Sequence, residues 1–308
     1  MKKNILITGS TDGIGKLAAT KLAQLGHNVY LHGRDARKLA DVIAEVKAAA
    51  TQTNQQADQQ ANQQIIIDGF VADFSKLSDV KSMADAVIKK FTAAGLHLDV
   101  LINNAGVFKV ANTQTPEGFD VRFVVNYFAP YLLTRALLPL MGKSVTEASN
   151  AAPNTNNSLP ARIVNLSSAA QQAVSAQALA GQKQLSDQDA YAQSKLALTM
   201  WSMALAEQVA TDNTNVIAVN PGSLLNTRMA NDAYGQHWSS ADKGADILVA
   251  LAVSDEFANE TGRYFDNDIK GEHGDKRGAF GTPHSDALNK SAIEQLIQNT
   301  EQILTPAL

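Results

Sequence analysis

The segment NILITGSTDGIGKLAATKLAQLG (residues 4–26) decides the fold of this chain. Its apolar start at 4–8 is typical of a buried strand, and a glycine-containing turn at 8–15 follows. The remainder is rich in residues that favour a helix, and Gly26 is a typical helix end. A strand, a glycine turn and a helix in this order predict the first half of a parallel βαβ unit.

The alternation of apolar runs and helical patterns continues along the chain. Further strands are predicted at 28–33, 64–73, 98–106, 161–168, 215–222 and 262–266. Helices are predicted from about residue 35, at 76–91, at 118–141 and at 189–210. Continuous apolar strands between helices predict an α/β fold with a doubly wound parallel sheet of about seven strands and helices on both faces. In such a sheet the ligand crevice lies at the carboxyl ends of the strands.

Two polar segments interrupt this alternation. Residues 48–64 are rich in Gln and have enough helix propensity to extend the preceding helix into solvent, and residues 144–160 are polar and contain proline. Strands resume directly after each segment, so both are predicted to be surface insertions rather than linkers. We therefore expect residues 1–308 to form a single domain.

Composition excludes several classes of function. The chain has 308 residues, 30 of them acidic and 26 basic, and no basic block that would favour nucleic acid. It has no cysteine, and its six histidines show no metal-ligand spacing. The apolar run at 5–7 is too short for a signal peptide, and we expect no segment long enough to span a membrane. We expect a soluble, cytoplasmic protein with no metal, nucleic-acid or membrane partner.

The turn TGSTDGIG (8–15) predicts a site for a dinucleotide. Gly9 permits a tight turn, and Gly13 and Gly15 let the backbone and the helix start approach a diphosphate. A simple strand-to-helix turn is the alternative. The predicted cofactor contacts in this turn are Thr8, Gly9, Ser10, Thr11, Asp12, Gly13, Ile14 and Gly15.

The end of the second strand bears on which dinucleotide binds. It reads LHGRD (31–35), with Gly33 where an acid would hold both ribose hydroxyls and Arg34 next to it. A guanidinium suits the 2′-phosphate of NADP(H), so NADP(H) is favoured and NAD(H) stays open. Arg34 pairing with Asp35 or capping a helix is the alternative. Lys16 and Arg37 are weaker candidates for the same phosphate.

Three later turns supply the other predicted cofactor contacts. After the third strand, Asp73 offers a carboxylate to the adenine amino group. The turn NNAG (103–106) ties neighbouring loops together and lets the backbone approach a nucleotide, although Asn-Asn is also an ordinary turn. After the sixth strand, a Pro-Gly turn precedes a threonine that can bond the nicotinamide amide. These contacts are Asp73, Phe74, Asn104, Ala105, Gly106, Pro221, Gly222 and Thr227.

Six motifs in sequence order carry a resemblance to a known family. They are TGSTDGIG, NNAG, VVN at 124–126, IVNLSS at 163–168, YAQSK at 191–195 and NPGSLLNT at 220–227. Together they resemble the short-chain dehydrogenases/reductases over about residues 3–266. RIVNLSS and AYAQSKLA are similar to the retinol-dehydrogenase-like branch, which includes many carbonyl reductases. The resemblance implies a Rossmann domain that binds NAD(P)(H).

The resemblance also implies a catalytic tetrad, carried here by Asn126, Ser168, Tyr191 and Lys195. Tyr191 and Lys195 are one helical turn apart, and the ammonium is expected to lower the pKa of the phenol. Tyr191 would then exchange a proton with a carbonyl or alcohol, and with Lys195 it would contact the cofactor. Ser168 would hold the reacting oxygen, and Asn126 a water that feeds protons to Lys195. A surface helix with a packed Tyr and a solvated Lys is the alternative for this pair alone.

The sequence therefore predicts an NADP(H)-dependent oxidoreductase acting on a carbonyl or alcohol. A predicted lid at 223–240 with Met229, Tyr234 and Trp238 favours an apolar substrate, although these residues also fit an ordinary surface helix. A non-catalytic NADP(H)-binding sensor on the same fold is the main alternative, and a sugar-nucleotide epimerase a weaker one. As in relatives, the helices at 118–141 and 189–210 could form a four-helix interface in a homodimer or tetramer, but a monomer would have the same pattern.

Overall fold

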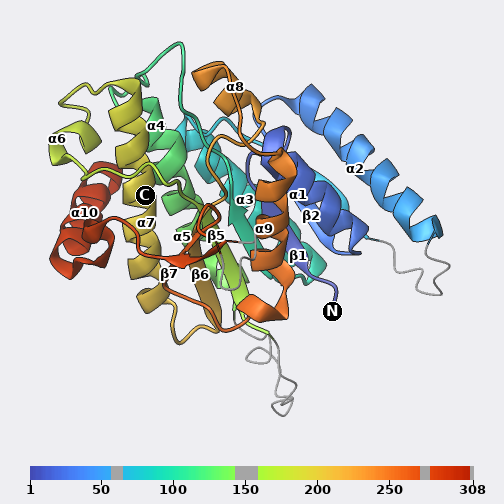
Figure 1. Cartoon of the computed structure of the whole chain (residues 1–308). Coiled ribbons are helices and arrows are strands. Elements are labelled where there is room, and N and C mark those ends of the chain that lie inside the picture. Colours follow the sequence, from blue (N-terminus) through green and yellow to red (C-terminus); the bar gives the residue numbers. More distant parts are fainter. Residues whose placement is uncertain (57–64, 143–158, 271–277, 306–308) are drawn as a thin grey trace.

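The computed structural model describes residues 1–56, 65–142, 159–270 and 278–305. One eight-stranded sheet with the order β3-β2-β1-β4-β5-β6-β7-β8 runs through the molecule (Figure 1). The strands are β1 (Asn4–Ile7), β2 (Asn28–Gly33), β3 (Ile67–Val71), β4 (Val100–Asn103), β5 (Ala161–Leu166), β6 (Thr214–Asn220), β7 (Arg263–Asp266) and β8 (Ala279–Gly281). All neighbours pair in parallel except β7 and β8.

The seven predicted strands are confirmed, and the α/β fold with them. The eighth, β8, was not predicted. It has only three residues and pairs antiparallel with β7, matching Phe265 with Phe280. A run this short has no periodicity that could distinguish it from a loop, so its pairing partner decides its structure.

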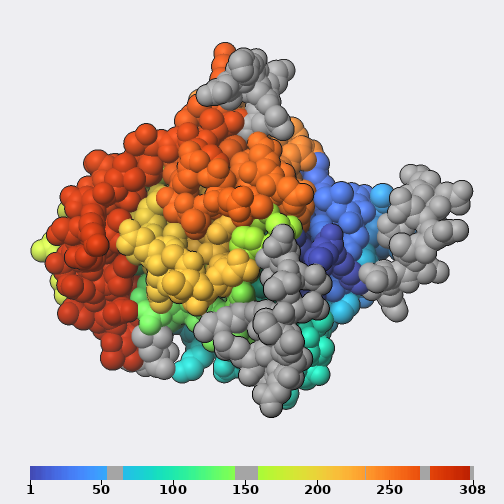
Figure 2. Space-filling model, turned by 90° about the horizontal axis from the view of Figure 1, so that it is seen from below, coloured from blue at the N-terminus to red at the C-terminus, as the bar shows by residue number. Residues whose placement is uncertain are grey.

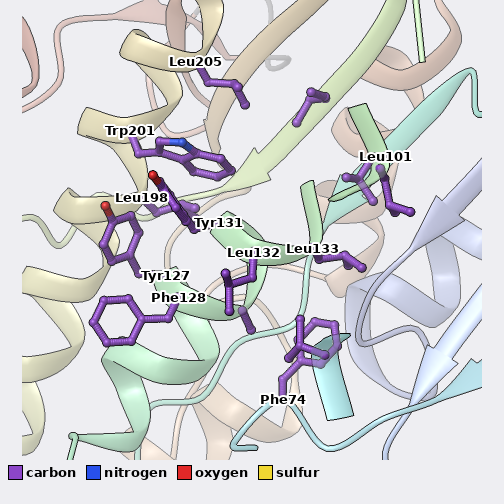
Figure 3. Packing of buried hydrophobic residues seen from close by; sticks show 14 of the residues in the cluster. Phe74, Leu101, Tyr127, Phe128, Tyr131, Leu132, Leu133, Leu198, Trp201 and Leu205 are labelled. Atoms are coloured by element: carbon purple, nitrogen blue, oxygen red, sulfur yellow. The ribbon is translucent and has the colours of Figure 1, made fainter. Parts of the chain in front are cut away.

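Helices cover both faces of the sheet and bury two apolar cores. On one face lie α1 (Gly13–Gln24), α2 (Ala36–Gln56) and α9 (Ala241–Val253); on the other lie α3 (Leu77–Ala94), α5 (Ala129–Leu137) and α7 (Asp187–Gln208). Figure 3 shows the core between the sheet and the helices α3, α5 and α7. There Tyr131 of α5 packs against Trp201 of α7 with ring centroids 5.2 Å apart. Trp201 is 2% exposed. Burying side chains of this size contributes about 1.5–3 kcal/mol each and fixes α7 against the sheet.

The helix predicted at 118–141 is interrupted in the structure. It consists of α4 (Val121–Phe123), a π-helical turn η1 (Val124–Phe128), α5 and a 3₁₀ turn η2 (Leu138–Leu140). A π turn holds one residue more than an α turn, and such turns are frequent at functional sites. Here the π turn contains Asn126. Apolar spacing cannot distinguish a π turn from a regular helix, because every residue of η1 is buried.

The same stretch corrects the expectation about membrane-spanning segments. Among the described residues, Val121–Leu140 is one segment that is long and apolar enough to cross a bilayer. Of the window that meets this test, 67% is buried inside the protein. A core helix satisfies the same criteria of length and composition, so this segment is weak evidence for a membrane span.

The two predicted insertions lie largely outside the described residues. The Gln-rich run does extend the preceding helix, since α2 continues to Gln56. Residues 57–64 and 143–158 are outside the part of the chain that the structure describes.

The C-terminal helix α10 (Lys290–Leu304) covers a face of α5 and α7. The Tyr127 hydroxyl lies 2.8 Å from the Thr300 hydroxyl, and Arg135 donates to Glu301 over 2.7 Å. In the view from below, these C-terminal residues (red) form one flank of the molecule beside the chain coloured yellow (Figure 2). The sequence predicts that the helices at 118–141 and 189–210 could form a four-helix interface between subunits. Around Tyr127 that interface could form only if α10 moved away.

We expect Leu296→Ala to lower the free energy of unfolding by about 2–5 kcal/mol, because Leu296 is 4% exposed and its loss leaves a cavity under α10. Leu288→Ala is the matched control, since Leu288 is 62% exposed and its truncation should cost less than about 0.5 kcal/mol. Urea unfolding of both variants measures the difference. Equal, small losses would mean that α10 is not part of the folded core.

Candidate active site

Glycines shape the two loops at the carboxyl ends of β1 and β4, where the sequence predicts the nucleotide crevice. Gly9 and Gly13 have φ angles of +62° and +53°, a region that side chains disfavour. A Cβ at Gly9 would lie 2.7 Å from the Cα of Ala105, and a Cβ at Gly15 would collide with the Asn104 amide. The predicted NNAG turn therefore lies directly against the glycine turn, with room for backbone only.

Three predicted cofactor contacts use their side chains inside the protein. The Thr8 hydroxyl accepts the N–H groups of Asn104 and Ala105, each over 3.0 Å. The Ser10 hydroxyl donates to the Ile7 carbonyl over 2.9 Å, and Ser10 is fully buried. The Asn104 amide donates to the carbonyls of Thr8 and Gly9, each over 2.8 Å. These side chains hold the loops in place rather than face the crevice.

His32, which sequence reasoning missed, supports the glycine turn. Its Nδ1 accepts the Gly9 N–H over 2.9 Å, so its Nε2 is assigned as the donor to the Ala72 carbonyl at 3.0 Å. Burial lowers the pKa of His32 to about 4, which keeps the ring neutral at pH 7. The ring of Phe74 stacks on it with centroids 4.1 Å apart. The predicted contact Phe74 is 4% exposed and acts here as a core residue.

Basic residues surround the end of β2. Arg34 is exposed, and among the described residues it forms no ion pair. The alternative partner Asp35 instead accepts the backbone N–H of Lys38, over 2.9 Å. The Lys38 ammonium bonds the carboxylate of Asp12, the N-cap of α1, over 2.8 Å. Arg34 therefore keeps its donors available at the mouth of the crevice.

Two further predicted contacts have partners of their own. Lys16 forms an ion pair with Glu45 on α2. The Asp73 carboxylate accepts both the N–H and the hydroxyl of Ser75, at 3.1 and 2.8 Å. Asp73 can still accept a bond through its second oxygen.

The loop after β6 forms the other side of the crevice. Gly222 turns the chain with a φ angle of +121° directly after Pro221. Thr227 is the N-cap of α8 (Arg228–Tyr234), where its hydroxyl accepts the Ala230 N–H over 3.3 Å. Its methyl group faces Gly13, so this loop and the glycine turn meet. The predicted lid residues 223–240 therefore border the nucleotide crevice.

The four predicted tetrad residues come together from three places in the chain. Asn126 lies in η1, Ser168 follows β5, and Tyr191 and Lys195 lie on α7. Lys195 Nζ donates to the Leu166 carbonyl over 2.7 Å and lies 5.6 Å from the centroid of the Tyr191 ring. The Ser168 hydroxyl lowers the pKa of the Tyr191 phenol, which indicates that the two side chains lie near each other.

Gly106 links the tetrad to the NNAG turn. A Cβ at this position would lie 3.4 Å from both the Asn126 Oδ1 and the Lys195 Nζ. Asn126 itself accepts the Val107 N–H over 2.8 Å and donates to the Val107 carbonyl and the Ser194 hydroxyl. The amide of Asn126 thus fixes the chain just after the NNAG turn, and the expected water-holding role stays a prediction.

The two serines of the motif have different surroundings. Ser167 is 3% exposed, and its hydroxyl lies 2.5 Å from the Thr199 hydroxyl on α7. Ser168 is half-buried, and it lowers the pKa of Tyr191. Ser167 is thus occupied inside the protein, and the choice of Ser168 as the catalytic serine stays a prediction.

Burial, rather than the lysine charge, dominates the ionisation of Tyr191. Burial raises the pKa of Tyr191 above its usual value near 10, and the hydrogen bond from Ser168 opposes this rise. The expected lowering is wrong for this structure: the pKa of Tyr191 is raised, chiefly by burial, and Lys195 is not among the groups that shift it. Burial also lowers the pKa of Lys195 to about 8, and the lysine remains mostly charged at pH 7.

An aromatic wall borders Tyr191. The ring of Phe108 lies 4.8 Å from that of Tyr191, and the ring of Tyr234 on α8 stacks on Phe108 at 5.7 Å. Sequence reasoning missed Phe108, whose position two residues after the NNAG turn was the available signal. Trp238 is 72% exposed and Met229 37% exposed, so they lie at the surface of the lid. Within the described residues, no group of three potential metal ligands occurs.

Comparisons with known proteins agree with this geometry. The sequence profile of the short chain dehydrogenase family matches residues 3–237. Retinol dehydrogenase 12 of Mus musculus is 30% identical over 273 residues, which cover 85% of this chain and 77% of the relative. Polyprenol dehydrogenase of Homo sapiens is 29% identical over 279 residues, which cover 85% and 76%.

Solved structures give the same result. A short chain dehydrogenase from Escherichia coli CFT073, complexed with NADPH, has a TM-score of 0.60 at 26% identity and covers 87% of this chain and 97% of its own. A Mycobacterium paratuberculosis protein, with a TM-score of 0.69 at 24% identity over 98% and 93% of the two chains, supports the fold alone. A family match over most of the sheet and these similarities confirm the resemblance drawn from the motifs: the chain belongs to the short-chain dehydrogenase/reductase family, in its retinol-dehydrogenase-like branch.

Proposed function

We propose that this protein is an NADP(H)-dependent oxidoreductase that interconverts a carbonyl and an alcohol, with Tyr191 as the general acid and base. The observation that carries the proposal is the meeting of Ser168, Tyr191 and Lys195 beside a crevice in which Gly9 and Gly15 leave space for backbone only. Family membership supports oxidoreductase chemistry.

The glycine crevice fits a dinucleotide. The helix α1 begins at Gly13, directly after the glycine turn, where Asp12 caps it by accepting the Gly13 N–H. A helix N-terminus at this place suits a diphosphate. Arg34, with no acidic partner among the described residues, suits a 2′-phosphate. Relatives of similar fold have been solved with NADP or NADPH. When bound, the nicotinamide would donate or accept the hydride.

The chain's own residues would handle the proton and the orientation of substrate. Burial keeps Tyr191 protonated at neutral pH, so it is ready to donate to a carbonyl oxygen. Ser168 would hold that oxygen next to the phenol, as a fixed hydrogen-bond donor does in other sites. In the oxidation direction Tyr191 must lose its proton, and the Lys195 ammonium and the Ser168 hydroxyl would stabilise the phenolate.

The surroundings of Tyr191 favour an uncharged, apolar substrate. Phe108 and Tyr234 border the phenol, and neither a carboxylate nor a basic side chain is among the groups that shift its pKa. Residues 223–240 would act as a lid over this space, with Tyr234 as its contact to Phe108. A cytoplasmic location and a homodimer or tetramer remain predictions that belong to this proposal.

Tyr191→Phe should bind NADPH normally but lose turnover by at least about 100-fold, because the phenol supplies the proton. Fluorescence titration measures binding, and NADPH consumption across aldehydes, ketones and quinones measures turnover. Full activity of the variant would refute the mechanism. If the wild type binds NADPH tightly and turns over no substrate, the non-catalytic sensor is favoured instead.

Arg34→Ala should weaken NADPH binding by about 10-fold to 100-fold and leave NADH binding nearly unchanged, because only NADPH carries the 2′-phosphate. Arg263→Ala is the control of equal charge: Arg263 begins β7 at the opposite edge of the sheet and pairs with Glu260. Titrations with both cofactors test this. An equal loss for NADPH and NADH would contradict the assignment of Arg34.

Lys195→Met should stabilise the cofactor-free protein by about 1–3 kcal/mol at pH 7 while abolishing most activity, because it removes a buried charge. The folded-state pKa of Lys195 is about 8, below its ordinary value of 10.5. Between these values only the unfolded wild type binds the proton, so wild-type stability rises with pH. The gain in the free energy of unfolding of Lys195→Met over the wild type should thus be largest below pH 8 and decrease towards pH 10.5.

Urea unfolding of both proteins between pH 6.5 and 10.5 measures this trend. Lys89→Met, at an exposed position on α3, should change stability by less than about 0.5 kcal/mol at every pH. A gain for Lys195→Met that is constant with pH would show that packing, not charge burial, is its cause.

A further inference from the structure

The backbone carbonyl of Ser168 accepts two hydrogen bonds, one from a nearby residue and one from a distant part of the chain. The Tyr264 hydroxyl donates to it over 3.0 Å, and the Gln171 amide donates to it over 2.9 Å. A carbonyl oxygen has two lone pairs, so both are used. The main chain at Ser168 is therefore held from outside its own strand.

Tyr264 is a rigid donor. It lies on β7, two strands away from β5, and is 4% exposed. Burial and the nearby Asp266 raise the pKa of Tyr264 well above its ordinary value, so the hydroxyl stays protonated and keeps its donor role. Its bond with Ser168 joins β7, the last parallel strand of the sheet, to the loop that follows β5 and contains Ser168. This loop is the proposed catalytic loop.

The residue before Ser168 is fixed from the other side. The Ser167 N–H donates to the Val219 carbonyl over 2.8 Å, and the Ser167 hydroxyl contacts Thr199 and the Lys195 carbonyl on α7. The Ser168 hydroxyl accepts the Ala170 N–H over 3.1 Å, so its own hydrogen remains available to donate. The main chain at Ser168 is therefore held on both sides, and the hydroxyl has a contact that limits its rotation.

Gln171 extends this network into the C-terminal part of the chain. Its Oε1 accepts the His284 N–H over 3.0 Å while its amide group donates to Ser168. Tyr264 and His284 both lie beyond residue 237, where the family match ends. Two elements outside the matched region therefore contact the proposed catalytic loop.

We propose that Tyr264, together with Gln171, is a positioning residue that holds the Ser168 main chain so that the Ser168 hydroxyl faces Tyr191. This inference rests on the proposed function of Ser168 and Tyr191. Tyr264 touches no reacting atom in this role and acts only through Ser168. Without its bond the carbonyl keeps Gln171 as a donor, so the loop stays folded but gains freedom to turn.

Tyr264→Phe should lower kcat by roughly 10-fold to 100-fold, since misplacing a reacting group by about 1 Å has effects of this size, and leave the KM for NADPH unchanged. The Ser168 hydrogen bond lowers the pKa of Tyr191, so weakening it should move the pH profile of alcohol oxidation to higher pH. Gln171→Ala, at a half-buried position, should shift both readouts in the same direction.

Tyr131→Phe is the matched control. Tyr131 is 1% exposed, and its hydroxyl bonds Glu301 and Arg135 on the outer face of α5. Its loss should change neither kcat nor the pH profile, although it removes a buried tyrosine hydroxyl as Tyr264→Phe does.

A double-mutant cycle with Ser168→Ala tests whether Tyr264 acts through the Ser168 hydroxyl. If Tyr264 acts through the Ser168 hydroxyl, adding Tyr264→Phe to Ser168→Ala should lower the rate no further. A further loss as large as in the wild type would overturn the inference and assign Tyr264 a direct role. If Tyr264→Phe has the same kinetics as the wild type while Ser168→Ala is inactive, this inference alone is overturned. If Ser168→Ala is fully active, the proposed function is overturned as well.

Discussion

The site depends on a lysine ammonium placed where water cannot solvate it. Lys195 is 4% exposed, and its ammonium donates to the Leu166 carbonyl. Burying a charge with one neutral partner is unfavourable, which lowers the pKa of Lys195 to about 8. The sheet and α7 must therefore be stable enough to bear that cost. A cation held in this way interacts strongly with any negative charge that develops on Tyr191, because little water screens it.

Much of the fold and the site could be predicted because short-range patterns specify them. Apolar runs gave seven parallel strands, and the glycine spacing located the crevice. The spacing of Tyr191 and Lys195 fixes their shared helix face. The ionisation of Tyr191 could not be predicted this way, because helical spacing gives the distance between two groups but not their burial.

The missed features come from contacts between distant segments. Tyr264 lies 96 residues from Ser168, and Tyr127 lies 173 residues from its partner Thr300. No periodic pattern predicts such pairs. Thr8 and Ser10 were expected to contact the cofactor, but their hydroxyls bond the protein backbone instead. Short polar side chains on a tight turn can do either, and only the packing of the neighbouring loops decides which bond forms. The loops thus gain their shape from residues that a motif would assign to ligand contact.

The ring of His32 has a consequence for how the crevice receives its occupant. It bridges the Gly9 N–H and the Ala72 carbonyl, and a planar ring with two bonded nitrogens hardly bends. The glycine turn and the chain at Ala72, next to the predicted adenine contact Asp73, are therefore tied together by one side chain rather than standing as two independent loops. Two loops joined in this way need less ordering when a ligand binds to both, so less conformational entropy opposes association.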